Sequence, residues 1–389
     1  MIRSPFSLYI HVPFCAQKCP YCDFNTYAVA RVPERDYVQA LCNELSSYRE
    51  HPGFAGRELQ SIFFGGGTPS LLSPAAIGDI IGHAVSVFPL GHDAEVTLEA
   101  NPSEPSASRY QGYREAGINR VSFGVQSFDT ERLTLLGRDH SSEDARQAVH
   151  AAVTGGITNV SIDIIFGVPG QSVDQLTKDL ETATSLPLTH ISTYALTIEA
   201  GTPFYQRQER GLLRLPPEER VAEMLSVIPE QLGKNGFQRY EISNYAKPGY
   251  ESRHNAAYWL GDDYLGIGAG AHSCITHTDG EQRLSADRWS TYALPASYIE
   301  RASMGTTVAW REALDQQGLK FEFFYLGLRR SAGVSRKRYQ QLFGEALPEN
   351  YEATFRDLAK EGFVMMSKDS IALTAHGIAL SDSVFERLA

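Results

Sequence analysis

Three of the five cysteines lie within eight positions near the N-terminus, in a C-x3-C-x2-C pattern. They are Cys15, Cys19 and Cys22, in the stretch HVPFCAQKCPYCDFN. Clustered thiols in a reducing compartment are more often metal ligands than disulfides. One interpretation is a structural zinc site completed by His11 or a remote residue, although zinc motifs usually carry two ligand pairs and no second pair follows here. The other is a four-iron cluster on three thiolates, which leaves the fourth iron open for a substrate.

A triple glycine closes the second apolar run, in SIFFGGGTP. It lacks the GK[ST] ending of a phosphate loop and the GxGxxG spacing of a dinucleotide site. Glycines at a strand end let the backbone approach a ligand and offer it N–H and C=O groups, so Gly66, Gly67 and Thr68 are candidate ligand contacts. A simple turn is the alternative interpretation.

Single polar residues stand at the ends of four later apolar runs or just beyond them. They are Glu99 in LEANP, Gln126 in GVQSF, Arg138 in LGRDH and Asp163 in SIDIIFGVPG. A carboxylate inside a barrel is costly unless it is paired or bound. Because the carboxyl ends of parallel strands converge, these residues are expected to meet at one binding site.

Short strand-like runs alternate with helix-patterned segments over the first 200 residues. Strands are expected at 7–13, 61–67, 95–102, 120–128, 159–170 and 190–198, and helices at 35–50, 75–88, 107–117, 142–156 and 172–186. This alternation predicts βαβ units and a parallel sheet. The fold class is therefore α/β, an open or closed (β/α) barrel, with a doubly wound sheet as the competitor.

The remainder of the chain divides into two further regions. We expect a barrel over 1–235, an extension over 236–309, rich in Tyr, Gly and His, and a small α+β unit over 310–389. In that last unit, helices at 311–330, 335–344 and 349–362 are followed by a hairpin at 363–377. This order resembles a winged helix. Cys42 and Cys274 stand alone and are expected to be buried.

Composition and charge exclude several classes of function. The net charge is −11, which argues against a nucleic-acid partner, and no apolar run reaches the length of a membrane helix. The stretch RRSAGVSRKRY holds five basic residues, but residues 311–389 contain eleven basic and eleven acidic residues. The basic run is therefore expected to be a solvated face, or to meet a partner protein or anionic membrane lipid. The absence of a signal peptide favours the cytoplasm.

The cysteine spacing on the loop after the first strand resembles the radical S-adenosylmethionine (SAM) superfamily. In that superfamily the open iron binds the methionine part of SAM. SLYIHVPFC, CPYCDF, FFGGGTPS, EANP, GVQSF, LGRDH and DIIFGVPGQ follow, in order, the oxygen-independent coproporphyrinogen III oxidase group. The resemblance covers nearly the whole chain and implies a partial TIM-like barrel with a small winged-helix-like domain. It also implies a 4Fe-4S cluster on the three cysteines and a SAM pocket lined by Tyr9, Tyr21, Gly66, Gly67, Thr68, Glu99, Gln126, Arg138 and Asp163.

Two branches of this group differ at points that the sequence shows. The oxidase branch carries a fourth cysteine where this chain has Phe24, whereas HemW-type heme chaperones end the motif in CDF and carry HNxxYW later. Here HNAAYW begins at His254. The resemblance therefore implies a heme carrier that serves recipient hemoproteins, with His254 as the heme ligand and His272 as the rival. There is no C-x-x-C-H attachment motif. The alternative is a coproporphyrinogen III oxidase that decarboxylates propionate side chains.

Overall fold

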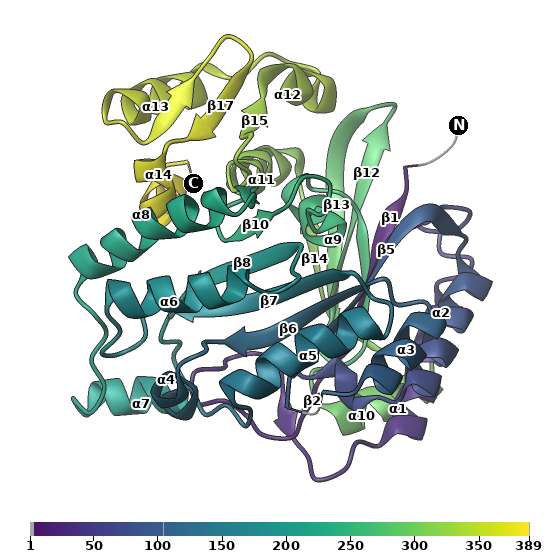
Figure 1. Ribbon diagram of the computed structural model, residues 1–389. Coiled ribbons are helices and arrows are strands. Elements are labelled where there is room, and N and C mark those ends of the chain that lie inside the picture. Colours follow the sequence, from purple (N-terminus) through teal and green to yellow (C-terminus); the bar gives the residue numbers. More distant parts are fainter. Residues whose placement is uncertain (1–3, 104, 389) are drawn as a thin grey trace.

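A single large sheet organises most of the molecule (Figure 1). The computed structural model describes residues 4–103 and 105–388. Within those residues twelve strands form one sheet in the order β14-β13-β12-β11-β1-β4-β5-β6-β7-β8-β10-β9. The six central strands are β1 (Phe6–Val12), β4 (Leu59–Gly66), β5 (Leu90–Ala100), β6 (Arg120–Gln126), β7 (Asn159–Phe166) and β8 (His190–Ala195).

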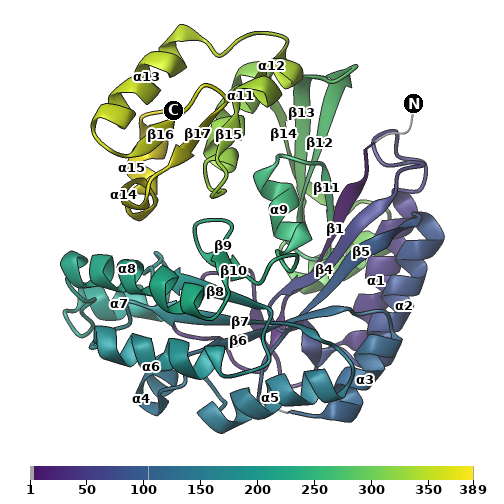
Figure 2. The same cartoon turned by 45° about the horizontal axis from the view of Figure 1, so that its top comes forward.

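These six strands are parallel and lie in the order of the chain. Right-handed crossovers without any reversal of strand order place all connecting helices on one side of the sheet. Figure 2 shows these helices around the outer, convex face. They are α1 (Glu34–Ser47), α2 (Pro74–Val87), α3 (Ala107–Glu115), α4 (Thr130–Leu135), α5 (Ser142–Thr154), α6 (Val173–Thr184), α7 (Pro203–Glu209) and α8 (Glu218–Lys234). The prediction of a (β/α) barrel is confirmed, and the doubly wound alternative is wrong because it requires such a reversal.

The barrel is open. β1 pairs on its free side with β11 (Tyr264–Ile267), and β8 pairs with β10 (Asn244–Ala246), so β1 and β8 do not meet in the described sheet. The two-residue strand β9 (Gln238–Arg239) completes the second edge.

Side chains along each strand point alternately to the outer and to the inner face of the barrel. Outward side chains such as Leu8, Phe64 and Val121 are fully buried in the main core beneath the helices. Inward side chains are largely polar, and several of them are also buried, among them Arg120 and His190. A barrel whose interior is polar must pair these groups with one another or with a ligand, since a buried polar group without a partner is costly.

Helix starts follow signals that are visible in the sequence. Ser141 and Asp144 form a reciprocal capping box at α5, and Ser172 with Gln175 does the same at α6. Ser73 caps α2, where Pro74 occupies the first turn.

The middle region extends both edges of the sheet. It supplies β9 and β10 at one edge and, at the other, β11, β12 (His272–Asp279), β13 (Gln282–Thr291) and β14 (Val308–Leu314), with α9 (Arg253–Trp259) and α10 (Pro295–Ser303). The predicted boundary at 309/310 falls within β14. A helix was expected from residue 311, and its first turn is wrong. Trp310, Arg311 and Glu312 pair with β13 in an exposed edge strand, and the helix begins only after the Asp315 cap.

The C-terminal unit has its own core. It contains α11 (Gln316–Gly327), α12 (Arg336–Phe343), α13 (Glu349–Lys360), α14 (Ala375–Ala379) and α15 (Ser381–Glu386), with a small sheet of β15 (Val334–Ser335), β17 (Ser370–Leu373) and β16 (Val364–Met366). Three helices followed by a hairpin are the order expected of a winged-helix-like unit.

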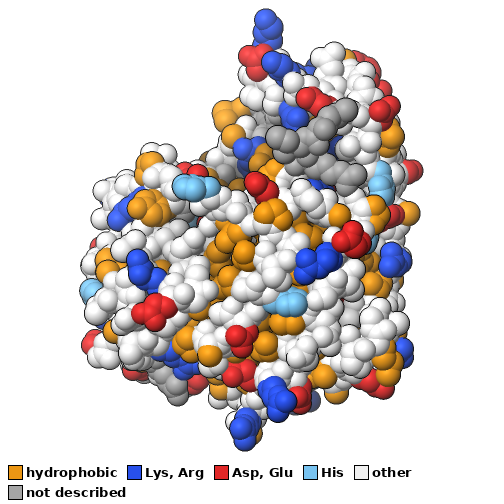
Figure 3. Space-filling view, turned by 90° about the vertical axis from the view of Figure 1, so that its right-hand side faces the viewer, with side chains coloured by type: hydrophobic (Ala, Val, Ile, Leu, Met, Phe, Trp, Pro, Cys, Tyr) orange, Lys and Arg blue, Asp and Glu red, His pale blue; other side chains and the backbone are white. Residues whose placement is uncertain are grey.

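Two of the five basic residues in the basic run of this unit make internal contacts. Arg329 stacks over the Trp259 ring at 4.9 Å, and Arg336 pairs with Glu352. Figure 3 shows one face of the molecule, where basic and acidic side chains are scattered without a continuous basic area. Within residues 4–103 and 105–388, no helix has the length and apolarity needed to cross a membrane.

Candidate functional site

The cysteine loop leaves the end of β1 and is closed at its base by backbone pairing. The short strands β2 (Phe14–Cys15) and β3 (Tyr27–Ala28) run parallel beside each other. The Lys18 ammonium donates to the carbonyl oxygens of Phe24 and Thr26, at 3.1 and 3.3 Å. The loop is therefore a closed Ω-shaped segment that holds its three cysteines above the barrel mouth.

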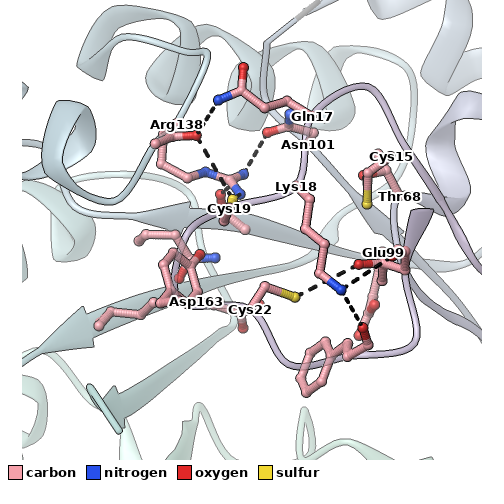
Figure 4. A pocket seen from close by; sticks show the side chains of 18 of the residues that line it. Cys15, Gln17, Lys18, Cys19, Cys22, Thr68, Glu99, Asn101, Arg138 and Asp163 are labelled. Atoms are coloured by element: carbon pink, nitrogen blue, oxygen red, sulfur yellow. Dashed lines mark hydrogen bonds between the residues drawn. The ribbon is translucent and has the colours of Figure 1, made fainter. Parts of the chain in front are cut away.

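The three thiols are free and partly exposed, and they line a single cavity. Arg138 Nη1 donates to Cys19 Sγ at 3.3 Å, and Thr68 Oγ1 donates to Cys15 Sγ at 3.6 Å. Figure 4 shows these side chains around the same space, with Glu99 and Asp163 on its floor. Burial raises the pKa of the Cys15 thiol, and the Thr68 hydrogen bond partly offsets this rise. The Cys15 thiol must therefore lose its proton when the cluster assembles, because the thiolate is the form that binds iron.

The triple glycine allows the end of β4 to pack against the base of the cysteine loop. Gly67 N–H donates to the Val12 carbonyl at 2.8 Å, and a Cβ on Gly67 would lie 2.6 Å from the Phe14 carbonyl oxygen. Gly66 has φ +110°, and a Cβ there would meet the His11 ring at 2.4 Å. Both positions therefore require glycine, and the triple glycine does more than form a simple turn.

Two partly buried carboxyls lie beneath the loop. Gly66 N–H donates to Glu99 Oε2 at 3.2 Å. Burial, followed by the charge of Asp163, raises the pKa of Glu99 to about 7. Burial also raises the pKa of Asp163, against the lowering effects of Ser192 and Arg120. Two neighbouring carboxyls in a low dielectric resist double ionisation, which a cationic ligand would relieve.

Gln126 and Arg138 complete the site from β6 and the loop after α4. Gln126 has φ +68°, the one positive φ of a non-glycine residue in the described chain. Such strain is typical of functional positions. Arg138 Nη2 donates to Asn101 Oδ1 at 2.7 Å and to the Gly124 carbonyl at 2.8 Å, so Arg138 ties the ends of β5 and β6 to the cysteine loop.

The cavity enclosed by these groups has a volume of about 420 Å³. All of the residues predicted for the cluster and SAM line it, with the exception of Tyr9. The Tyr9 hydroxyl instead shares a hydrogen bond of 3.0 Å with His11 Nδ1 inside the barrel. The Tyr9 side chain points into the barrel, below its mouth. It therefore lies behind Glu99 and does not reach the cavity surface.

Several lining residues were not predicted. Asn101 and Tyr194 lie at or next to the carboxyl ends of strands, where the barrel rule could have found them, whereas Ser122 lies within β6. Arg120 was missed because its position at the start of β6 looks like a solvated strand end. In the structure it is 2% exposed and faces the inner carboxyls.

The residues present fit a four-iron cluster with SAM at its open iron. Three thiolates on one loop supply the donor set, and the glycine cradle leaves room above β4. The lining side chains include two basic residues and five acidic ones, which suits the sulfonium and ammonium charges of SAM. Among the described residues, no three His, Cys, Asp or Glu side chains gather around one point as ligands of a single ion.

The HNxxYW motif forms α9, which covers the end of the barrel opposite the cysteine loop. The Glu95 carboxylate of β5 accepts the N–H groups of Arg253 and His254, both at 3.2 Å. This arrangement satisfies free donors in the first turn of α9 with a buried anion.

His254 is enclosed and fully hydrogen-bonded. Its side chain is 1% exposed and stacks on Phe63 at 4.8 Å. Nδ1 lies 2.9 Å from Ser61 Oγ, and Nε2 lies 3.1 Å from Tyr258 Oη. Because Ser61 donates its own proton to Ser7, Nδ1–H must donate to Ser61, and Nε2 accepts from Tyr258. Neither nitrogen is open to an iron atom.

His272 is the exposed alternative at the start of β12, with its ring 6.3 Å from that of Trp310. Its side chain lines neither the cavity beside the cysteine loop nor the cavity between α9 and the C-terminal unit. The two lone cysteines also differ from each other: Cys274 is buried as expected, whereas Cys42 is partly exposed.

Comparison with known families matches two parts of the chain. Residues 9–183 match the radical SAM superfamily, and residues 314–380 match the HemN C-terminal domain.

Two relatives that match over nearly their whole length are named as heme chaperones. The chain is 36% identical to the heme chaperone HemW of Bacillus subtilis, over 97% of this chain and 98% of that protein. It is 37% identical to the heme chaperone HemW of Escherichia coli, over 98% and 97%. A mitochondrial radical S-adenosyl methionine domain-containing protein 1 of Danio rerio is 35% identical over 97% and 85%.

Among solved structures, coproporphyrinogen III oxidase (HemN) from Escherichia coli superposes with a TM-score of 0.82. The match covers 99% of this chain and 90% of that one at 24% identity. At this identity the superposition establishes the shared fold alone.

Proposed function

Because the chain belongs to the HemW family of heme chaperones within the radical SAM superfamily, we propose that it binds heme and passes it to recipient hemoproteins. The observation that carries this proposal is the pair of branch-specific features in a chain that aligns with these chaperones along nearly its whole length. Phe24 stands where the oxidases place a cysteine, and it is 64% exposed at the cavity.

We assign the 4Fe-4S cluster to Cys15, Cys19 and Cys22, and SAM to the acidic cavity beside them. The cluster, when bound, supplies an open iron for the methionine part of SAM and an electron. In this assignment Arg138 fixes the position of Cys19, and the Gly66–Gly67 backbone lies against SAM. The partly buried Glu99 and Asp163 carboxyls would balance the positive charges of SAM.

The affinity for SAM is expected to rise between about pH 6 and pH 8, as Glu99 ionises. The pKa of Glu99 in the folded protein, about 7, exceeds its ordinary value of 4.5. In the free protein, the stability that Glu99 contributes is therefore present below pH 4.5 and is lost as the pH rises through about 7. A bound cationic ligand instead favours the ionised form of Glu99.

Glu99→Gln should flatten the pH dependence of SAM binding, measured by calorimetry on the reconstituted protein. Glu131→Gln, in an exposed turn of α4 outside the cavity, is the matched control. An equal rise of affinity with pH in Glu99→Gln would show that another group controls SAM binding.

The runner-up function is oxidative decarboxylation of coproporphyrinogen III. An anaerobic experiment with two arms separates the two functions. One arm supplies coproporphyrinogen, SAM and reductant, and we expect no protoporphyrinogen. The other arm offers the heme-loaded protein to an apo-hemoprotein, and we expect heme to move. Protoporphyrinogen formation together with failed transfer would establish the oxidase instead.

We propose the cytoplasm as the location, because the three clustered thiols need a reducing compartment. Arg329 and Arg336 of the basic run are engaged within the fold and are not available to a membrane-binding surface. Because the rest of the surface is only weakly basic, we expect the recipient to be a protein and not a nucleic acid.

A further inference from the structure

A second cavity lies between the barrel extension and the C-terminal unit. Its volume is about 440 Å³, within the usual range for a cofactor-sized ligand. Its walls come from α9, from β11 to β13, and from α11, α12 and β15, and Figure 2 shows α9 and β11–β13 facing the C-terminal unit. It is formed only when regions some 70 residues apart in the sequence pack together.

Four arginines and only two carboxylates line this cavity, in a chain whose net charge is −11. Arg288 is neutralised by Glu322 at 2.5 Å. The other three arginines, Arg283, Arg330 and Arg338, form no ion pair within residues 4–103 and 105–388, and the remaining carboxylate is Asp262.

Arg283 is the least satisfied of these cations. Its Nη2 donates only a long bond, 3.4 Å, to the Leu260 carbonyl oxygen. Gly261, at φ +66°, makes room for the guanidinium, since a Cβ there would lie 2.7 Å from Nη1. Burial lowers the pKa of Arg283; the charges of Asp262 and Asp263 oppose this effect, and the smaller effect of Arg338 adds to it. Because Arg283 and Arg338 form no ion pair among the described residues, their guanidinium groups remain available to an anion.

The remaining walls are aromatic and aliphatic. Tyr258 and Tyr264 meet edge to face at 4.7 Å, and Phe323, Leu326 and Leu342 also line the cavity. Aromatic walls combined with cations suit a planar apolar ligand that carries carboxylates.

We propose that this second cavity holds heme, with the macrocycle against the aromatic wall and the two propionates on Arg283 and Arg338. The proposal rests on the proposed function and adds the location of the cargo. The two cavities are lined by side chains of opposite net charge, so each disfavours the ligand of the other. The acidic first cavity repels a dicarboxylate, and the basic second cavity repels SAM.

The HNxxYW motif gains a different role from this placement. Tyr258 and Trp259 line the second cavity, whereas His254 lies behind Tyr258 and accepts its hydroxyl hydrogen bond. His254 is thus a positioning residue. Among the described residues no histidine lines the cavity, and its potential iron ligands are the Tyr264 hydroxyl and the Cys274 thiol.

The second cavity is also remote from the cluster. α9 contacts β4 at Ser61, whereas β4 ends beside the cysteine loop at Gly66, five residues or about 17 Å further along the strand. Heme held beyond α9 is therefore separated from bound SAM by the floor of the barrel, which favours carriage of intact heme over its chemical conversion.

The test is a hemin titration of the full-length protein, followed by the Soret band. The Arg283→Gln/Arg338→Gln double variant should bind hemin at least about tenfold more weakly, because each lost charged contact is worth roughly tenfold. Lys337→Gln, a neighbouring exposed cation outside the cavity, should bind like the parent protein. Hemin dimethyl ester, which lacks the carboxylates, should bind the parent and the double variant equally.

Ala332→Trp provides a second variant, at an exposed lining position where a large side chain fills the cavity without disturbing the core. It should also lose hemin binding while keeping SAM binding. Parent-like hemin affinity in both the double variant and Ala332→Trp would overturn the placement, yet leave the heme carrier intact. Failure of the parent protein itself to bind hemin would instead overturn the proposed function.

Discussion

Serine in place of Cys19 is expected to remove the iron–sulfur cluster almost completely. Three thiolates are the minimum that holds a four-iron cube with one open iron, and a serine hydroxyl is a poor substitute for a thiolate. Cys19 also accepts the Arg138 hydrogen bond at 3.3 Å, so the variant loses the ligand that is positioned most firmly. After anaerobic reconstitution, iron should fall from about four atoms per chain to near zero, together with the visible charge-transfer absorbance.

Cys42→Ser is the matched control for this experiment. Cys42 lies in α1, away from the cysteine loop, and its replacement should leave iron content and spectrum unchanged. A Cys19→Ser protein with full iron content would show that the cluster uses another ligand, and the assignment of the loop would fail.

Alanine in place of His254 is expected to destabilise the protein by about 3 kcal/mol or more, without changing the Soret maximum of bound hemin. The change empties a buried site beside Phe63 and leaves the Ser61 and Tyr258 hydroxyls without their partner. Because neither nitrogen of His254 faces a cavity, the iron coordination should persist. Denaturant unfolding measures the stability, and hemin titration gives the spectrum.

His254→Gln separates the two contributions, since an amide can replace at least one of the hydrogen bonds. It should recover part of the lost stability. Unchanged stability in His254→Ala, combined with a shifted Soret band, would restore His254 as the iron ligand and contradict its role as a support for Tyr258.

The strand-end residues of the first cavity could be predicted from the sequence because the βα order determines where they meet. Once six strands alternate with helices, Glu99, Gln126 and Asp163 must converge at one mouth, and the structure places them there. Tyr9 was assigned to the cavity only by resemblance. Its position in the middle of β1 directs its hydroxyl to His11 instead.

The structure buries His254 away from both cavities, for a physical reason that the sequence hides. A histidine four residues before a tyrosine on a helix can bond to it, but the motif alone does not reveal which of the two faces a ligand. Burial against β4 decides this, and β4 is almost 200 residues away. The second cavity was hidden in the same way, since its arginines come from β13 and from the basic run of the C-terminal unit, which looks like a solvated face in the sequence.

The most direct measurement of the central claim is the transfer of intact heme. The reconstituted protein, loaded with one equivalent of hemin, is mixed anaerobically with a tagged apo-hemoprotein in the presence of SAM and reductant. The two proteins are then separated, and the tetrapyrrole is identified by mass. We predict that most of the heme moves to the recipient with its mass unchanged. Heme that stays on the donor, or a tetrapyrrole of altered mass, would contradict a heme carrier.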